Sequence, residues 1–526
     1  MAMICIPIIA PSVKEALRDI ADAQRFADIL ELRLDYMAHP ITSLVRKSRK
    51  PVIVTIRKSS EGGRNAFSDW QRFSMFREAM KAGAAFIDIE FSSLPLFKAL
   101  QQEKARIGAP ARFILSHHDF HKTDKAKVLG LVGKMQSFDP DVVKIAAFAN
   151  SLSDNLVMLE LAVSAAKGKK SLDGTKKKNM GDAGKGSRKE IIPLCMGPWG
   201  QLSRILCPML GAFLTYGSLP GKPSAPGQID AASLKDIFRV NKLHNPKVYG
   251  LVGNPVSQSK GFLIHNHWFA QCSLNAVYVN FLVENLSDFF HNFSPWVEGL
   301  SITIPFKQDA LRHTLSIDPL AKKVGAVNTL IKRQKGKKTY WEGFNTDVAG
   351  AMGSVEDRIR LKGANALILG AGGVARAVGY GMKEKGSNIF ICNRSRSKGN
   401  SFARELHGIF IPKVEHLVRY PGKMDIVANA TSVGMAPQVK ETPLPRNILK
   451  TITHKKSVVF DTVYSPEKTA LLDDARALGL RTVSGVEMFL RQAQQQFFLW
   501  TKRMPDIDAG RKLVALNRFT MLDIRN

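Results

Sequence analysis

The residue with the clearest chemical potential is Lys144, which lies inside the apolar segment VVKIAAFA at residues 142–149. A lysine in an apolar strand is costly unless its amine is neutral or paired. Burial and nearby arginine charges would lower the pKa of this amine and make it a nucleophile for a carbonyl carbon. The alternative is a side chain that extends from the strand end into solvent.

The segment SHHDF at residues 116–120 offers a base for the same chemistry. An imine-forming lysine beside an imidazole is a working set for removing the proton next to a ketone. Because neighbouring side chains on an extended strand face opposite ways, only one of His117 and His118 should reach a shared site. The sequence has no HEXXH pattern and no Cys/His pairs at zinc spacing, so we predict no metal.

These residues fall on or after short apolar segments in the first half of the chain. The segments alternate with amphipathic stretches such as residues 68–82 and 153–166. Eight β/α units within about 230 residues predict a closed (β/α)8 TIM barrel, and an open doubly wound sheet is the alternative. The predicted strands are Ile4–Ile9, Ile29–Leu34, Val52–Ile56, Phe86–Phe91, Arg112–Leu115, Val142–Ala147, Ile191–Met196 and Phe213–Tyr216.

Chemistry in such barrels lies where strands end and the following loops begin. The polar residues at those ends include arginines, which would bind the carboxylate of an anionic substrate, with surface ion pairing as the alternative. The candidates are Glu31, Arg33, Asp35, Arg57, Asp88, Glu90, Ser116, His117, His118, Asp119, Lys144, Arg204, Ser224 and Gln228.

The ordered motifs ELRLD, TIRKSSEGG, DIE, SHHDF, VKIA, SR and SAPGQ resemble type I 3-dehydroquinate dehydratase over residues 1–235. The resemblance implies that Lys144 forms a Schiff base with the substrate ketone, that His118 removes the adjacent proton, and that Glu90 orients His118. It also implies substrate contacts from Glu31, Arg33, Arg57, Arg204, Ser224 and Gln228. The basic insertion at residues 167–189 departs from the compact family pattern and should leave the site undisturbed.

The second half contains a glycine-rich turn in the segment NALILGAGGVARAV. An apolar strand runs through Gly370, Gly372 and Gly373 into a helix, which is the G-x-G-x-x-A form of a dinucleotide-binding turn. Glycines let the backbone approach a pyrophosphate, and the helix N-terminus adds partial positive charge. A tight turn without a ligand is the alternative. The next strand ends in the basic segment NRSRSK at residues 393–398, which suits a 2′-phosphate and favours NADP(H) over NAD.

Lys307 and Asp347 form a second candidate pair. Reduction of a ketone needs a proton donor at the developing alkoxide, and a lysine held by a carboxylate can serve. Lys307 is expected at the end of a strand formed by GLSITIPFK, and Asp347 follows in GFNTD. The spacing alone does not show that the two side chains meet, and a solvated lysine is the alternative.

Nine ordered motifs resemble shikimate dehydrogenase over residues 247–500, namely GNPVSQSKGFLIHN, ITIPFK, GAVNTL, GFNTD, LGAGGVARA, NRSRSK, NATSVGM, DTVYSP and SGVEMFLRQA. The resemblance implies Lys307 and Asp347 as the catalytic dyad. It implies shikimate contacts from Ser257, Ser259, Thr303, Asn328, Tyr464 and Gln492, and NADPH contacts from Gly370, Gly372, Gly373, Asn393, Arg394 and Lys398. Val256 and Lys260 stand where the family usually has histidine and proline.

The product of the first reaction is the substrate of the second, so the whole chain resembles the bifunctional dehydratase–dehydrogenase of the shikimate pathway. The predicted α/β organisation is a barrel at 1–235, a linker at 236–246, a substrate lobe at 247–350, a Rossmann NADP-binding lobe at 351–485, and a C-terminal helix and tail at 486–526 that return to the substrate lobe. The alternatives are a reductase with an inert barrel and a dehydrogenase of the quinate type.

The composition restricts the remaining classes. The chain has 526 residues, 45% of them hydrophobic, and a net charge of +31, which excludes wholesale disorder, collagen and a disulfide scaffold. The densest basic block, 167–189, lacks interleaved aromatics, so small carboxylates are favoured as partners over nucleic acid. No apolar run approaches the ~18 residues of a membrane span. Five cysteines without a CxxC motif indicate a reduced, cytoplasmic protein, and no oligomeric state is predicted.

Overall fold

The computed structural model describes residues 2–36, 41–167, 189–225, 227–257, 259–420 and 422–515. Contacts divide the chain into two compact units, the first ending at Lys247 and the second beginning at Val248. Most of the basic insertion, 168–188, and the tail from 516 lie outside the described residues, so the expectations about them stay predictions. No helix in the described ranges combines the length and the apolar character that a membrane crossing requires.

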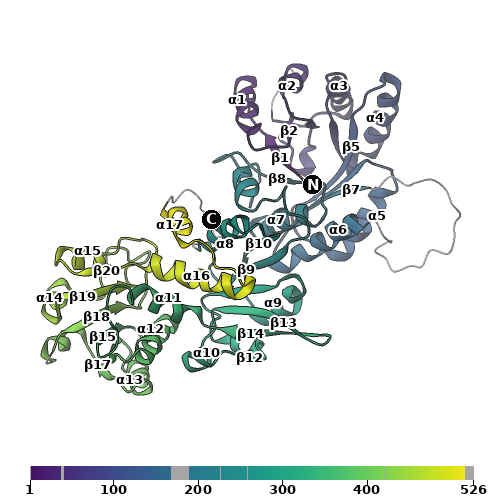
Figure 1. The fold of residues 1–526 in the computed structure, drawn as a ribbon. Coiled ribbons are helices and arrows are strands. Elements are labelled where there is room, and N and C mark those ends of the chain that lie inside the picture. Colours follow the sequence, from purple (N-terminus) through teal and green to yellow (C-terminus); the bar gives the residue numbers. More distant parts are fainter. Residues whose placement is uncertain are drawn as a thin grey trace. The chain divides into compact units, whose positions relative to one another are not determined.

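The first unit is a parallel sheet of eight strands that curls into a nearly closed barrel (Figure 1). The strand order is β7-β6-β5-β4-β3-β2-β1-β8. Phe213 N donates to Ile191 O at 2.8 Å, which links the start of β8 to β7. The strands are β1 (Met3–Ile8), β2 (Ile29–Arg33), β3 (Val52–Thr55), β4 (Phe86–Glu90), β5 (Arg112–Asp119), β6 (Val142–Phe148), β7 (Glu190–Met196) and β8 (Leu214–Tyr216). The (β/α)8 prediction is confirmed.

In the described residues, one α-helix follows each of the first seven strands. These helices are α1 (Val13–Ala23), α2 (Ile41–Lys47), α3 (Asp69–Lys81), α4 (Leu94–Ile107), α5 (Lys125–Gln136), α6 (Asn155–Lys167) and α7 (Gln201–Leu210). Helix α3 shows how the sequence determines where a helix begins and which face it buries. Ser68 accepts from Gln71 N and Gln71 returns a bond to the Ser68 backbone, a reciprocal cap that starts the helix. Phe76, Ala79 and Met80 then bury one face at helical spacing.

The barrel interior consists of layers that follow the two-residue period of the strands. One apolar layer contains Cys5, Ile29, Ile53, Phe86, Ile114, Val142, Ile192 and Leu214. Because side chains alternate along a strand, the residue two positions further faces the same way. That step gives the buried polar layer Glu31, Thr55, Asp88, Ser116 and Lys144. The chemistry is therefore placed toward the carboxyl ends of the strands.

Strand β5 is longer than predicted. It continues past Leu115 to Asp119, because its ladder with β6 runs from Ile114 opposite Val142 to Asp119 opposite Ala147. His117 and His118 are consequently strand residues on opposite faces. The connector at 236–246 is also more ordered than a tether, since Phe238 and Val240 are buried.

The second unit contains two sheets. The first has the order β10-β9-β11-β13-β14-β12, with β9 parallel to β11 and β13 antiparallel to both β11 and β14. Its strands are β9 (Lys247–Gly253), β10 (Ala276–Leu282), β11 (Gly299–Ile302), β12 (Ser316–Ile317), β13 (Thr329–Lys335) and β14 (Lys338–Phe344). The accompanying helices are α8 (Gly261–Gln271), α9 (Leu286–Phe293) and α10 (Pro319–Val324).

The other sheet is fully parallel, in the order β17-β16-β15-β18-β19-β20. This is the 3-2-1-4-5-6 order of dinucleotide-binding folds. Its strands are β15 (Asn365–Leu369), β16 (Asn388–Cys392), β17 (Ile409–Ile411), β18 (Met424–Asn429), β19 (Thr453–Asp461) and β20 (Arg481–Val483). Its helices are α11 (Thr346–Val355), α12 (Gly373–Glu384), α13 (Arg396–Glu405), α14 (Arg446–Ile452) and α15 (Ala470–Ala477).

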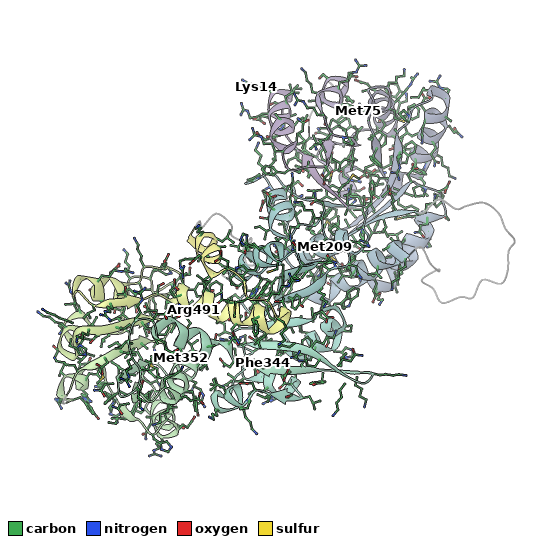
Figure 2. All side chains as sticks on the ribbon, viewed as in Figure 1. Lys14, Met75, Met209, Phe344, Met352 and Arg491 are labelled. Carbon is green, nitrogen blue, oxygen red and sulfur yellow. The ribbon has the colours of Figure 1, made fainter. Side chains whose placement is uncertain are left out.

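Two further helices, α16 (Gly485–Thr501) and α17 (Ile507–Ala515), end the described chain. Helix α16 packs along α11 and also contacts β13 and α8, so it joins the two lobes of this unit (Figure 1). Met352 on α11, labelled in Figure 2, belongs to the core cluster of the parallel sheet. The two-lobed prediction is confirmed.

Candidate active sites

A cavity of about 120 Å³ opens at the carboxyl ends of the barrel strands. Its lining includes Glu31, Arg33, Arg57, His118, Lys144, Arg204, Ser224 and Gln228. Eight of the nine residues predicted for this site thus surround one cavity, and Glu90 is the exception. Tyr36, Glu61, Phe120 and Tyr216 also line it, although sequence reasoning assigned them no role.

Lys144 faces this cavity from β6 and is only 4% exposed. Its Nζ lies 2.9 Å from Asp88 Oδ2, 2.9 Å from Tyr216 Oη and 3.6 Å from Glu31 Oε1. The solvent-exposed alternative is therefore wrong. Nearby arginines were expected to act on this amine, but the charged groups that pair with it are two carboxylates, Asp88 and Glu31.

Asp88 is the centre of the buried charge network. It accepts from Arg57 Nη2 at 2.9 Å and from Lys144. Burial alone would raise the pKa of Asp88, but the charges of Arg57 and Lys144 outweigh it and hold that pKa below its usual value. Arg57 also donates to Ser116 Oγ at 2.7 Å. Asp88 is thus an ionised acceptor that fixes both cations.

The carboxylate that contacts His118 is Glu61, which corrects the prediction for Glu90. His118 Nδ1 lies 3.2 Å from Glu61 Oε2, which also accepts from the His118 backbone N–H. Glu90 instead accepts from Arg57, from Lys58 N at 2.9 Å and from Arg72 on α3. These three donors bind the Glu90 carboxylate at the end of β4. Glu61, in the loop after β3, contacts His118 on β5 instead.

Burial lowers the pKa of His118, and the nearby charges of Arg57 and Lys144 lower it further. The imidazole is therefore neutral and able to accept a proton near neutral pH. His117 lies on the opposite face of β5 and does not line the cavity, as the alternation of a strand requires.

Arg204 on α7 offers a cation to an incoming anion. It is 2% exposed, its Nε has no hydrogen-bond partner, and no described residue forms an ion pair with it. Burial lowers its pKa to about 10, so the guanidinium remains charged at neutral pH. A buried cation of this kind suits a substrate carboxylate. Across the same cavity, Ser224 Oγ donates to Gln228 Oε1 at 3.0 Å.

In the second unit, Lys307 Nζ and Asp347 Oδ2 lie 2.6 Å apart. The structure thus brings together two residues whose spacing left their contact open. Strand β11 ends at Ile302, earlier than predicted, because Phe306 N bonds to Thr303 O and turns the chain. Lys307 follows in that turn, and Asp347 lies in the first turn of α11.

Two further predicted residues lie beside this pair. Asn328 Nδ2 donates to Asp347 Oδ1 at 2.8 Å, and Asn328 Oδ1 accepts from Thr346 N at 2.8 Å. Gln492 Oε1 lies 3.5 Å from Asn328 Nδ2 and 3.4 Å from Thr346 Oγ1. The dyad is therefore anchored through Asn328.

The remaining predicted substrate residues lie on the ends of elements around this lobe. Ser257 and Ser259 follow β9, and Thr303 follows β11, its parallel neighbour. Tyr464 stacks on Phe489 at 4.9 Å between ring centroids.

Lys260, which departs from the family pattern, precedes α8, and its Nζ lies 3.4 Å from Val514 O on α17. Val256, the other departure, is buried.

The glycine-rich turn joins β15 to α12 as predicted. Gly370 has φ +116°, and a Cβ there would lie 2.9 Å from Ala430 O. A Cβ at Gly372 or Gly373 would meet nothing within 4 Å, so open space lies in front of the helix N-terminus. These features fit the approach of a pyrophosphate.

The basic segment lies next to this turn, since Gly370 N donates to Cys392 O at the end of β16. Asn393 Nδ2 donates to Ser395 O at 2.9 Å, and Arg394 and Lys398 are exposed. Two exposed basic side chains beside an open glycine turn suit the 2′-phosphate of a dinucleotide, in addition to its pyrophosphate. The described residues contain no group of His, Cys, Asp and Glu side chains placed to hold a metal ion.

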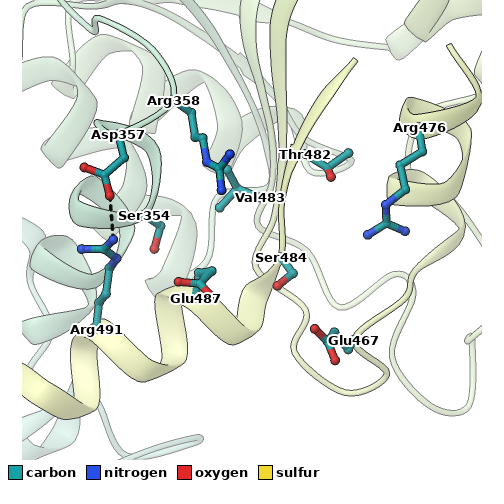
Figure 3. A pocket seen from close by; sticks show the side chains of 10 residues that line it. All are labelled: Ser354, Asp357, Arg358, Glu467, Arg476, Thr482, Val483, Ser484, Glu487 and Arg491. Carbon is teal, nitrogen blue, oxygen red and sulfur yellow. Dashed lines mark hydrogen bonds and ion pairs between the residues drawn. The ribbon is translucent and has the colours of Figure 1, made fainter. Parts of the chain in front are cut away.

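A separate hollow of about 310 Å³ lies near the start of α16 (Figure 3). Arg491 and Asp357 on its wall form an ion pair at 2.7 Å. None of the residues predicted from the sequence lines it, so the candidate chemistry lies elsewhere.

Comparison with protein families divides the chain in the same way. Residues 4–245 match type I 3-dehydroquinase, and residues 251–330 match the shikimate dehydrogenase substrate binding domain. Residues 354–463 match shikimate / quinate 5-dehydrogenase, and residues 485–515 match the shikimate 5'-dehydrogenase C-terminal domain.

A bifunctional 3-dehydroquinate dehydratase/shikimate dehydrogenase, chloroplastic, from Arabidopsis thaliana is 34% identical over 527 residues. The match covers 95% of this chain and 82% of that relative. The chain belongs to the bifunctional 3-dehydroquinate dehydratase/shikimate dehydrogenase family. Both resemblances found in the motifs are thereby confirmed.

Other similar proteins match either one half of this bifunctional chain or nearly all of it. A shikimate dehydrogenase (NADP(+)) from Pyrococcus abyssi is 36% identical over 273 residues, which are 52% of this chain and 98% of the relative. The solved dehydroquinate dehydratase and shikimate dehydrogenase from S. pombe is 25% identical, with 98% of each chain covered and a TM-score of 0.45.

Glu61 is the main residue of this bifunctional enzyme's barrel that sequence reasoning missed. It lies within the motif TIRKSSEGG, four residues after Arg57, in a loop that follows a strand. A carboxylate beside two glycines at such a position was a usable signal, but Glu90, on a strand, followed the simpler pattern.

Proposed function

We propose that the barrel dehydrates 3-dehydroquinate to 3-dehydroshikimate and that the second unit reduces this product to shikimate with NADPH. The chain is a bifunctional enzyme by its family, and the observation that carries the residue roles is the buried amine of Lys144 facing a cavity with a neutral imidazole. A buried lysine and histidine stabilise a fold less well than apolar residues of similar size, so their burial points to a chemical role. An inert barrel is therefore not favoured.

In the barrel, the Lys144 ammonium first gives one proton to the neutral imidazole of His118, and the free amine attacks the substrate ketone. The former ketone oxygen takes up that proton and leaves as water, which forms a protonated imine. Asp88 and Tyr216 hold the amine toward the cavity before the attack. His118 then removes the proton on the carbon next to the imine and returns it to the hydroxyl on the following carbon, which leaves as water. Hydrolysis of the imine releases the product and restores the amine.

Arg204 supplies the unpaired cation for the substrate carboxylate, and Glu61 orients His118. Arg33 is already paired with Asp35 at 2.8 Å, so we assign it a weaker part in carboxylate binding. Ser224 and Gln228 line the same cavity and are placed to contact substrate hydroxyls.

In the second unit, Lys307 donates the proton that the developing alkoxide needs, and Asp347 holds the ammonium toward the substrate. NADPH, when bound, supplies the hydride. Ser257, Ser259, Thr303, Tyr464 and Gln492 would hold the substrate, with Asn328 holding Asp347. Gly372 and Gly373 would receive the pyrophosphate, and Asn393, Arg394 and Lys398 the 2′-phosphate end. The P. abyssi relative is named for NADP(+), in agreement with this cofactor.

We also place the enzyme in a reducing compartment, the cytoplasm in the simplest case. All five cysteines are free, and burial raises the pKa of Cys5, Cys195, Cys207 and Cys392, which keeps these thiols unreactive.

A coupled assay tests the proposal. Purified chain is supplied with 3-dehydroquinate and NADPH, and shikimate is measured with NADPH consumption. We expect shikimate without any added enzyme, and a much slower reaction with NADH. If 3-dehydroquinate is unchanged while 3-dehydroshikimate is reduced, the dehydratase half fails. If NADH serves better, the assignment of Arg394 and Lys398 fails.

A further inference from the structure

A buried polar network lies behind the Lys307–Asp347 pair and takes no part in the chemistry described so far. It consists of Tyr278 on β10, Ser301 on β11, Thr329 on β13 and Gln496 on α16, all of them buried. Buried polar groups are costly unless each finds partners. The partners that these groups find lead, one bond after another, to the dyad.

Gln496 uses both ends of its side-chain amide. Its Nε2 donates to the Asn328 carbonyl oxygen at 3.1 Å and to Thr329 Oγ1 at 2.9 Å. Its Oε1 accepts from Ser301 Oγ at 3.0 Å, and Ser301 in turn accepts from Tyr278 Oη at 2.8 Å. A flipped amide would place its oxygen against a carbonyl oxygen, so only one orientation satisfies the network.

This orientation is passed on through Thr329. A hydroxyl has a single proton, and Thr329 Oγ1 accepts from Gln496, so its proton remains to be donated. Asn328 Oδ1 at 2.9 Å is the nearer of two acceptors, the other being Thr346 Oγ1 at 3.2 Å. With its oxygen held by Thr329 and by Thr346 N, the Asn328 amide directs its nitrogen to Asp347 Oδ1 at 2.8 Å. The other oxygen of Asp347 holds Lys307 at 2.6 Å.

We propose that Gln496 is a positioning residue for the reduction, because it fixes the orientation of the Asn328 amide and thereby the direction in which Asp347 holds Lys307. The inference rests on the proposed function of the dyad. Gln496 lies one helical turn beyond Gln492 on the same face of α16, but it acts from behind the site. Without its donor, the Thr329 proton is free to turn away, and the Asn328 oxygen loses one of the bonds that keep it from facing Asp347.

Gln496→Met tests this, because methionine keeps the length of the side chain and removes the amide. Gln494→Met is the matched control, since Gln494 is on the same helix and donates to Pro505 O at 2.9 Å, away from the dyad. The readouts are kcat and KM for 3-dehydroshikimate, with the dehydratase rate and NADPH affinity reporting that each unit is folded. We expect kcat to fall about tenfold for Gln496→Met, the scale of one misdirected hydrogen bond, and to stay within about twofold for Gln494→Met.

A double-mutant cycle separates positioning from a general structural role. Thr329→Val interrupts the same chain, so Gln496→Met combined with Thr329→Val should lower kcat no more than either change alone. If Gln496→Met loses NADPH binding, Gln496→Glu, which keeps the shape and loses the donor when ionised, replaces it in the cycle. An unchanged kcat, a rise in KM alone, or losses that multiply would overturn the inference. The unmodified enzyme must first reduce 3-dehydroshikimate, and its failure to do so would reject the proposed function instead.

Discussion

The two candidate sites are assembled in different ways. The barrel site is drawn from neighbouring strands of one sheet, where every second residue faces the same interior. Asp88 is fully buried, and Arg57 and Lys144 nearly so. The dehydrogenase dyad joins a turn after β11 to the first turn of α11, with side-chain exposures of 17% for Lys307 and 9% for Asp347.

The difference concerns what each charge does for the fold. In the barrel, removing one charge leaves its partners buried and uncompensated, which costs far more than the pair contributes. In the dyad, Asp347 is buried but Lys307 keeps more contact with water, so removal of one partner should cost less stability than in the barrel. Barrel substitutions should therefore affect activity and stability together, whereas dyad substitutions should affect mainly activity.

The largest expected effect is that of Lys144→Ala. Without the amine no imine forms, and the dehydratase kcat should fall by at least about 10⁴-fold, as losses of covalent nucleophiles do. The rate of 3-dehydroshikimate reduction should be unchanged in the same preparation. A dehydratase loss below about a hundredfold would remove covalent catalysis from the account.

Lys307→Ala should lower the reduction kcat by about 10³-fold, within the range for loss of a general acid. Dehydration of 3-dehydroquinate, followed by the absorbance of its product, should continue at the unmodified rate. A fall in both rates would show that the two sites are not independent.

A matched pair of carboxylate changes tests the stability contrast directly. Asp88→Asn leaves Arg57 and Lys144 buried and should destabilise the barrel by about 3–5 kcal/mol. Asp347→Asn leaves the partly exposed Lys307 without its carboxylate and should cost the second unit less, about 1–2 kcal/mol. Calorimetry of the full chain, with the transition of each unit identified by its loss of activity, measures both. Equal shifts in the two variants would refute the contrast.

The smallest effect concerns the pH dependence of the dehydratase. Burial, with the charges of Arg57 and Lys144, lowers the pKa of His118 below its ordinary value of 6.5. The base acts in its neutral form, so activity should persist below pH 6.5 and decline only as the pH falls through the lowered pKa. A profile of kcat/KM against pH should place this acidic limb below 6.5. A limb at or above 6.5 would indicate a solvent-exposed imidazole.

Much of the barrel site follows from the sequence because a strand has a fixed two-residue period. The steps from Ile114 to Ser116 to His118, and from Val142 to Lys144, place the reactive side chains inside once the strands are recognised. Glu61 could not be predicted from this period, because it lies in the loop after β3. Only the folded structure shows that this loop approaches β5.

The dehydrogenase site depends more on tertiary structure. Lys307 and Asp347 are 40 residues apart, and their side-chain atoms lie 2.6 Å apart. Backbone bonds from Val327 N to Lys307 O and from Asn328 N to Phe344 O bring the two segments together. The role inferred for Gln496 needs the direction of each hydrogen bond, which no spacing reports. The glycine-rich turn was predictable because its strand–turn–helix context is local.

The central claim is that Lys144 condenses with the substrate ketone, and borohydride trapping tests it most directly. The chain is mixed with 3-dehydroquinate and reduced with borohydride, and the peptide carrying the added mass is identified. The account predicts one stable secondary amine, at Lys144, and full retention of reductase activity. A chain that turns over 3-dehydroquinate yet yields no adduct, or an adduct on another lysine, would contradict it.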